Sequence, residues 1–205
     1  RDWFDAANLR ELRWVSELRT QFAAPRWHRF DGVKIKRAGK TVTDIDFVAY
    51  DSHDQSVILF QLKWQQPPVQ DDRLRRNNGS SLVGDSNKWI SDVADWIEMA
   101  GNSGIKERLS IRTGEDLRIH LVVLGRYHAH FTESLDHDPR ALWCDWGNFI
   151  RHRLLQPHEA GSDFMQSLAK SVREMTASVQ PESFFIPLGD LLVLTNPRRI
   201  QPARG

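Results

Sequence analysis

Two neighbouring strand-like segments of this chain carry polar side chains among apolar ones. The first segment (TVTDIDFVAYD) contains Asp44 and Asp46, and the second (SVILFQLKW) contains Gln61 and Lys63. Because successive side chains of a strand point to opposite faces, Asp44 and Asp46 are expected to share a face, as are Gln61 and Lys63. The apolar side chains of the first segment are expected on its other face: Ile45, Phe47 and Ala49.

The short polar turn between these segments, residues 52–55, makes them antiparallel neighbours. Asp46 then lies near Gln61 and Lys63, so a carboxylate, an amide and an ammonium group share one patch. Burying charge is costly unless the charge is paired or binds a metal, and oxygen ligands suit Mg²⁺. An ammonium group beside them can orient a metal-activated water or neutralise a phosphate. The patch therefore indicates a metal site; the simpler alternative is a cross-strand ion pair facing solvent.

The elements that position these residues follow from periodicity and from the helix-breaking residues Gly and Pro. Residues 2–24 lack Gly and Pro and are rich in Leu, Ala, Arg and Glu, which predicts a helix that ends at Pro25. Further helices are expected over residues 86–100, which the glycines of 101–104 end, 147–155 and 164–179. Strands are expected over residues 27–36, 41–51, 56–64, 117–124, 141–146 and 191–194. The order helix, three strands, helix, strand indicates a layered α/β or α+β domain.

Composition limits the class of protein. With 205 residues, 40% apolar and 27% charged, the chain has the size and composition of a single globular domain. No apolar run reaches the ~18 residues of a membrane span, so no membrane association is expected. The chain opens without Met and without an apolar leader, which suggests part of a longer cytoplasmic protein. The single Cys144 excludes a disulfide framework and fits a reducing compartment.

Asp46, followed by Gln61-Leu62-Lys63 at the end of the next strand, resembles the motif of the PD-(D/E)xK nuclease superfamily. The stretch DIDFVAYDSHDQSVILFQLKW is similar to the hairpin that carries this motif, and Gln in place of Glu resembles the Mrr-type branch. The resemblance covers roughly residues 2–124. It implies a restriction-endonuclease-like fold, in which a central mixed sheet is flanked by helices. The expected single nuclease-like domain has its core over about residues 1–155 and an accessory C-terminal helix and strand over about 156–205.

The resemblance implies a Mg²⁺-dependent nuclease, with Mn²⁺ as a substitute, that hydrolyses phosphodiester bonds of DNA in restriction, defence or repair. Asp46 and Gln61 would bind the metal, Lys63 would position the attacking water, and a glutamate of the first helix would complete the metal shell. The neutral Gln61 departs from the commoner carboxylate and brings less negative charge to the metal. The alternative function is a catalytically inactive domain that binds nucleic acid or a protein partner within a larger protein.

Two glutamates of the first helix are candidates for the metal shell. At 100° per residue, four apolar side chains fall within about 40° of Glu11, whereas Glu17 points about 120° away. The four apolar residues are Phe4, Val15, Leu18 and Phe22. Glu11 is therefore expected inside a stripe that faces the sheet, and it is the preferred ligand. Asp44 is either a further ligand that compensates for Gln61 or a residue that bonds the end of the strands.

Basic residues after the motif are candidate contacts to DNA. Residues 65–85 are rich in Pro, Asp, Arg, Asn and Gly and are expected to form a mobile surface loop that carries Arg73, Arg75 and Arg76. The loop leaves directly from the proposed site, where a phosphate backbone would lie; the alternative is a solvated loop. Lys88 is expected in the first turn of the next helix, where the helix dipole disfavours a cation, so either a phosphate binds there or the lysine is merely exposed. DNA, other domains of the parent protein and a second copy of the chain are the expected partners.

Overall fold

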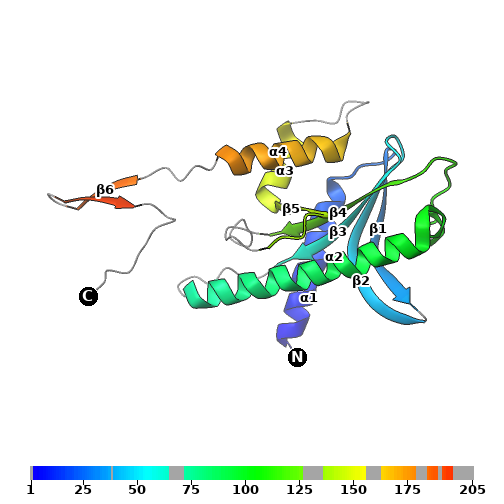
Figure 1. Cartoon of the computed structure of the whole chain (residues 1–205), viewed down its shortest axis with the longest axis horizontal. Helices are drawn as coiled ribbons and strands as arrows, with labels where there is room; N and C mark the ends of the chain where they lie inside the picture. Colours follow the sequence, from blue (N-terminus) through cyan, green and yellow to red (C-terminus); the bar gives the residue numbers. More distant parts are fainter. Residues whose placement is uncertain are drawn as a thin grey trace.

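The computed structural model describes residues 2–37, 39–64, 72–126, 136–155, 163–178, 184–188 and 191–195. A five-stranded mixed sheet lies between helices on both faces, which confirms the expected α/β architecture (Figure 1). Its strands are β1 (Trp27–Arg37), β2 (Lys40–Asp51), β3 (Ser56–Lys63), β4 (Arg118–Gly125) and β5 (Ala141–Asp145). The helices are α1 (Asp2–Thr20), α2 (Asp72–Arg108), α3 (Trp146–Leu155) and α4 (Phe164–Ser178). A separate two-stranded sheet contains β6 (Phe184–Leu188), which the sequence did not predict, and β7 (Leu191–Thr195).

The first three strands form an antiparallel meander, as the short polar turns predicted. β1 pairs with β2 along almost its whole length, and β2 pairs with β3 from Asp51↔Ser56 to Phe47↔Phe60. β4 and β5 then add in parallel to β3, and such parallel pairs need crossover connections. The long helix α2 provides the crossover from β3 to β4. The carboxyl ends of β3, β4 and β5 therefore meet at one edge of the sheet.

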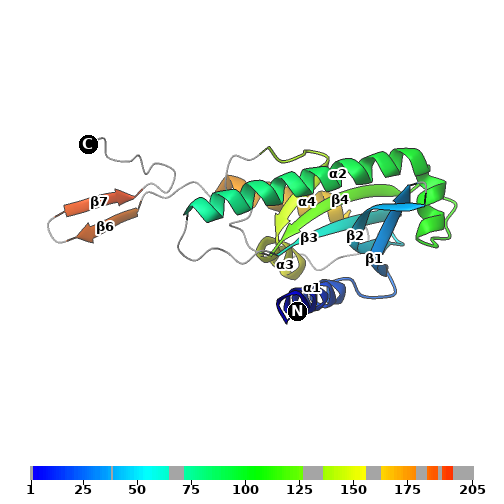
Figure 2. The ribbon, with the colours of Figure 1, turned by 90° about the horizontal axis from the view of Figure 1, so that it is seen from below.

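The two faces of the sheet carry separate hydrophobic clusters. On one face α2 buries Trp89, Ile90, Val93 and Ile105 against the sheet. Figure 2 shows α2 along this face and α1 on the opposite one. The opposite cluster is built by α1, α3 and α4 with the inward side chains of β2 to β5. The helical members of that cluster are Trp14, Leu18, Phe149, Phe164, Met165 and Leu168.

Helix α4 belongs to the core. Its first two turns bury Phe164, Met165 and Leu168 in the same cluster as Phe22 of the segment that follows α1, and the rings of Phe22 and Phe164 are 5.9 Å apart. A boundary of the core near residue 155 is therefore too early. The apolar spacing of α4 had predicted the helix, but not where its apolar side packs.

The segment predicted as a loop over residues 65–85 is helical from Asp72 onward, so that expectation was wrong for its second half. Leu82, Val83 and Ser86 are buried together with Trp89 and Ile90, which continues the three-to-four residue spacing of α2 toward its N-terminus. The Ser86 hydroxyl donates a 2.8 Å hydrogen bond to the carbonyl of Leu82. Burial of this stripe outweighs the low helix propensity of the local Gly and Asn residues.

Helix α2 also continues beyond the glycines that were expected to end it. Gly101 has φ 60° and ψ −177°, which kinks the helix, and helical structure resumes to Arg108. The second part buries Ile105, and Leu109 lies buried just after the helix ends. Glycine permits the left-handed φ at the kink, so the chain turns without losing the following helical turns.

Side-chain alternation along β2 breaks at Asp46. Phe47 and Ala49 face the α1 cluster as expected, but Ile45 packs in the α2 cluster, so the expectation that these three share a face was wrong. Across from Asp46 on β1, between the pairs Asp31↔Phe47 and Val33↔Ile45, Gly32 has φ 58°. A left-handed residue in a strand twists it locally, which explains the change of face.

Candidate active site

Asp46 lies at the fork where β2 leaves β3. Paired residues end at Phe47↔Phe60, so Asp46 and Gln61 are the next residues beyond the last pair. The Gln61 side chain donates from Nε2 to Asp46 Oδ2 at 2.7 Å, and the backbone N–H of Leu62 donates to the same oxygen at 2.6 Å. The divergence of the strands leaves the Leu62 N–H without a strand partner on β2, and the carboxylate takes that role. Oδ1 of Asp46 accepts no hydrogen bond from any residue in the described ranges.

The surroundings of Asp46 oppose its ionisation. The pKa of Asp46 is raised from 3.8 to about 7, chiefly because burial penalises the charged form. The hydrogen bond from Leu62 lowers the pKa, the charges of Glu11 and Asp44 raise it, and the charge of Lys63 lowers it. Three carboxylates and one ammonium group thus act on one another at this fork. A strongly raised carboxyl pKa beside a specific cation is typical of functional sites.

Lys63 lies two residues beyond Gln61 at the carboxyl end of β3. Its side chain is half-buried and forms no ion pair with any residue that the structure describes. Its backbone carbonyl accepts a 2.9 Å hydrogen bond from the N–H of Arg126, which fixes the end of β3 against the end of β4. The fork therefore has an ammonium group that no carboxylate of the described residues binds directly.

Of the two glutamates of α1, Glu11 differs from the expectation drawn from the helical wheel. Glu11 is exposed rather than buried, because the N-terminal half of α1 extends past the sheet, where Leu9 and Leu12 are also exposed (Figure 1). Its charge nevertheless acts on Asp46. Glu17, expected to point away, is half-buried and binds Arg126 at 2.7 Å between Oε2 and Nη1.

Asp44 was proposed either as a further metal ligand or as a residue that bonds the end of the strands, and it has features of both. Its side chain is exposed, and its charge contributes to the raised pKa of Asp46. Its backbone carbonyl accepts a 2.8 Å hydrogen bond from the Trp89 indole, which ties the end of the meander to α2. The indole bond is made by the backbone alone, so the Asp44 carboxylate stays available to the fork.

The oxygen atoms at the fork are of the type that a hard cation prefers, but there are few of them. Gln61 donates through Nε2, which leaves its Oε1 as an acceptor, and Asp46 offers Oδ1. Oxygen donors of these types, with Glu11 nearby, are those that Mg²⁺ takes. Among the described residues, no group of three or more His, Cys, Asp and Glu side chains is arranged to hold a metal ion. Mg²⁺ commonly keeps several waters and takes few protein ligands.

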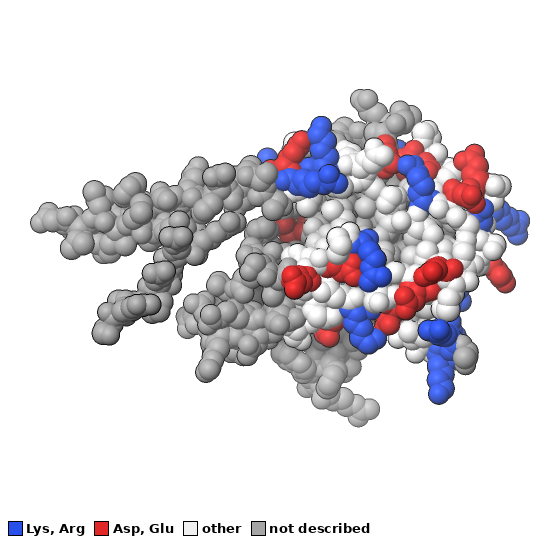
Figure 3. All heavy atoms as spheres, viewed as in Figure 1, with Lys and Arg blue, Asp and Glu red and all other residues white. Residues whose placement is uncertain are grey.

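The structure describes only one of the four side chains that were proposed to contact DNA. Arg73, Arg75 and Arg76 lie on the first two turns of α2, and their side chains fall outside what the structure describes. Lys88 lies in the middle of α2, so the argument from the helix dipole was wrong; its Nζ binds Asp92 at 2.6 Å. On the face drawn in Figure 3, acidic and basic side chains of the described residues are interspersed.

Sequence reasoning missed Arg126. Its guanidinium group lies between Glu17 and three indole rings, at distances of 5.1 to 5.6 Å from the ring centroids. The rings belong to Trp14, Trp64 and Trp146. This cluster joins α1, the ends of β3 and β4, and the start of α3. An arginine immediately after a buried parallel strand was the available signal, since the carboxyl ends of such strands commonly form sites.

Comparison with known proteins adds no assignment. A scan against protein-family models finds no match, and a search of curated proteins finds none either. Within the described ranges, no helix has both the length and the apolar character that crossing a membrane requires.

Proposed function

We propose that this chain is a metal-dependent nuclease of the PD-(D/E)xK type with a restriction-endonuclease-like core, acting on DNA. The observation that carries the proposal is the Asp46–Gln61 hydrogen bond of 2.7 Å at the strand fork, with Lys63 two residues further along β3. The Lys63 charge acts on Asp46 as well, which supports one shared site for the carboxylate, amide and ammonium groups. A direct ion pair with Lys63 would lower the pKa of Asp46, whereas burial and the charges of Glu11 and Asp44 raise it.

In this proposal, Asp46 and Gln61 would hold a Mg²⁺ ion, with Glu11 as a further ligand. When bound, Mg²⁺ or Mn²⁺ lowers the pKa of a coordinated water and neutralises charge on the phosphate. The Lys63 ammonium group donates hydrogen bonds to the attacking water and to a non-bridging phosphate oxygen. Water then adds to phosphorus and the P–O bond to the leaving oxygen breaks, which leaves a phosphate monoester and a hydroxyl end.

DNA is the proposed substrate because the chain leads from the end of β3, which carries Lys63, into α2, whose first two turns carry Arg73, Arg75 and Arg76. Cations at the edge of a hydrolytic site bind the phosphates on either side of the scissile bond. The near-zero net charge of the chain, +1, requires such local contacts, because no overall positive field attracts DNA.

The test is cleavage of supercoiled and linear DNA by the purified chain with Mg²⁺, with Mn²⁺ and with EDTA. Asp46→Ala and Lys63→Ala are each expected to lower cleavage at least ~100-fold. Glu98→Ala and Lys36→Ala, which remove exposed charges of the same kinds elsewhere, serve as controls and retain full activity. Unchanged cleavage in Asp46→Ala, or cleavage that persists in EDTA, contradicts the proposal.

A second candidate function rests on the neutral Gln61 and on the small number of acidic ligands among the described residues. A domain that keeps this fold without turnover would bind DNA equally well in EDTA and in Mg²⁺. It would show no cleavage with either metal. Binding with no cleavage in the same experiment therefore favours this candidate.

A further inference from the structure

A pocket of about 430 Å³ opens at the opposite end of β2 from the candidate active site. Its walls come from β1, from the end of β2, from the turn between β2 and β3, and from the segment that follows α2. The residues that matter for its chemistry are His28, Phe30, Tyr50, Ser110, Arg112 and Thr113. This volume suits a small organic ligand.

One wall of the pocket is aromatic. His28 and Tyr50 are paired across β1 and β2, and their rings lie 5.6 Å apart at an interplanar angle of 30°. Phe30 lies two residues along β1 and lines the same pocket. The Tyr50 hydroxyl is held by a 2.9 Å hydrogen bond to Gln55 Oε1, so the ring is fixed in place before any ligand binds. Tyr50 itself is buried, whereas His28 is exposed and Phe30 is half-buried, so the aromatic surface open to a flat heterocycle belongs to His28 and Phe30.

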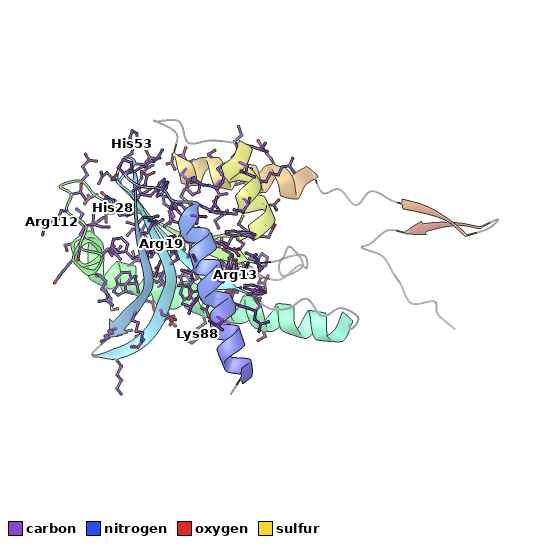
Figure 4. The ribbon with its side chains drawn as sticks, turned by 180° about the vertical axis from the view of Figure 1, so that it is seen from behind. Arg13, Arg19, His28, His53, Lys88 and Arg112 are labelled. Carbon is purple, nitrogen blue, oxygen red and sulfur yellow. The ribbon has the colours of Figure 1, made fainter. Side chains whose placement is uncertain are left out.

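The opposite wall carries a cation and hydroxyl groups. Arg112 is exposed and forms no ion pair with any residue in the described ranges, and Ser110 and Thr113 stand on either side of it. Figure 4 shows Arg112 and His28 at the same end of the molecule, with Lys88 well away from them. Glu115 is near enough for its charge to raise the pKa of Tyr50. A guanidinium group beside hydroxyl donors is suited to a phosphate group.

The backbone around the pocket is unusual. Gln55 and Ser110 have φ values of 50° and 53°, and they are the non-glycine residues with positive φ in the described part of the chain. Both line this pocket. Non-glycine residues are held in the left-handed region at some cost, and such positions cluster at ligand sites.

We propose that this pocket binds a nucleotide, with the base stacked on the exposed ring of His28 beside Phe30 and the phosphate bound by Arg112. The aromatic wall selects a flat ring, and the separate cation selects an anionic group. Only the two features together select a ligand that has both. Tyr50 lies four residues from Asp46 along β2, or about 13 Å at ~3.3 Å per residue. The pocket is thus a site distinct from the fork, and the inference does not rest on the nuclease activity.

The test is calorimetric titration of the purified chain with AMP, with adenosine and with inorganic phosphate. AMP is expected to bind at least ~10-fold more tightly than either fragment, because it uses both walls. Arg112→Ala and His28→Ala should each weaken AMP binding about tenfold, and Arg151→Ala, an exposed arginine on α3, should leave it unchanged. Glu115→Gln should strengthen AMP binding several-fold, because it removes a negative charge near an anion.

Asp46→Asn keeps normal AMP binding if the two sites are independent, whatever its effect on cleavage. Titration with a short single-stranded oligonucleotide distinguishes a free nucleotide from a nucleotide within a bound strand. If Arg112→Ala weakens AMP but not oligonucleotide binding, the ligand is a free nucleotide; if it weakens both, the pocket takes a nucleotide of a bound strand. The inference is overturned if AMP shows no saturable binding at millimolar concentration, or if inorganic phosphate binds as tightly as AMP.

Discussion

Gln61 donates a hydrogen bond of 2.7 Å to the same Asp46 oxygen that the backbone of Leu62 contacts at 2.6 Å. One carboxylate oxygen therefore has two donors at the fork, while the other is left for a ligand. The neutral amide is suited to this arrangement, because a carboxylate at position 61 has no N–H to donate and would repel Asp46. Gln rather than Glu at position 61 thus has a structural role, because its amide donates to Asp46.

Gln61→Glu is expected to destabilise the metal-free protein and to tighten divalent metal binding. The substitution removes a donor and adds a like charge beside Asp46, whereas a bound cation would be attracted by both carboxylates. Thermal unfolding in EDTA should show a lower midpoint than the unmodified chain, and saturating Mn²⁺ should raise the midpoint more in the variant. Equal responses to Mn²⁺ in the two proteins would show that position 61 does not face a cation.

Asp46→Asn is expected to stabilise the metal-free protein at high pH. Asp46 has a folded pKa of about 7, above its usual value of 3.8, so the folded state holds its proton more tightly than the unfolded state. The cost of the ionised carboxylate is absent below about pH 4, grows by at most ~1.4 kcal/mol per pH unit up to about pH 7, and is constant above it. Asn keeps an acceptor for Leu62 and carries no charge.

Urea unfolding of both proteins in EDTA at pH 5 and pH 8 measures this difference. The gain in unfolding free energy for Asp46→Asn should be larger at pH 8, and Glu98→Gln, which removes an exposed carboxylate, should show no such dependence. A gain that is independent of pH would mean that Asp46 is ionised across this whole range.

The sequence predicted the sheet well, because its information is local. Strand-length apolar segments joined by short polar turns identify β1, β2 and β3, and an uninterrupted apolar run identifies β4. The residues of the motif could be placed on two adjacent strands for the same reason. The break at Asp46 could not be foreseen, since it depends on the left-handed Gly32 across the strand pair.

What the sequence did not show depends on contacts between distant segments. The N-terminal part of α2 contains Gly and Asn, and its helical state is favoured by the burial of Leu82 and Val83 further along the helix. The direction of Glu11 around α1 could be worked out from the helical period, but its exposure depends on how far α1 extends beyond the sheet. The same applies to Arg126, whose indole neighbours come from three separate elements.

Replacing Arg73, Arg75 and Arg76 together by Ala is expected to weaken DNA binding. The remaining binding should depend less steeply on salt concentration. For each phosphate that the variant no longer binds, the slope of log K against log salt should fall by about 0.9 on duplex DNA. Lys88→Ala provides the comparison, because the Lys88 ammonium group already binds Asp92. Fluorescence anisotropy with labelled duplex DNA at several salt concentrations measures both slopes, and an unchanged slope in the triple variant would show that these arginines do not bind phosphates.

Arg126→Ala is expected to lower the unfolding free energy by roughly 2 kcal/mol or more. The change removes an ion pair with Glu17 and the packing on three indole rings, and cation–π interactions at partly buried sites contribute about 0.5–2 kcal/mol each. Arg126→Lys should recover only part of this stability, because an ammonium group lacks the planar surface that packs on the rings. Urea unfolding measures the unfolding free energy of both variants. If Arg126→Lys has the full stability of the unmodified chain, the positive charge alone accounts for the contribution of Arg126.

The two glutamates of α1 are expected to have different effects on Asp46 and on metal binding. Glu11→Gln removes a charge that raises the pKa of Asp46, so the pKa of Asp46 in the metal-free protein should fall; Glu17→Gln should leave it in place, because Glu17 acts on Arg126 instead. Carboxyl-directed NMR titration follows Asp46 in each variant. Metal binding should respond in the same order, with Glu11→Gln weakening Mn²⁺ affinity and Glu17→Gln having little effect. If Glu17→Gln instead weakens Mn²⁺ binding while Glu11→Gln leaves both quantities unchanged, the glutamate of the metal shell is Glu17, and Arg126 must release it when the ion binds.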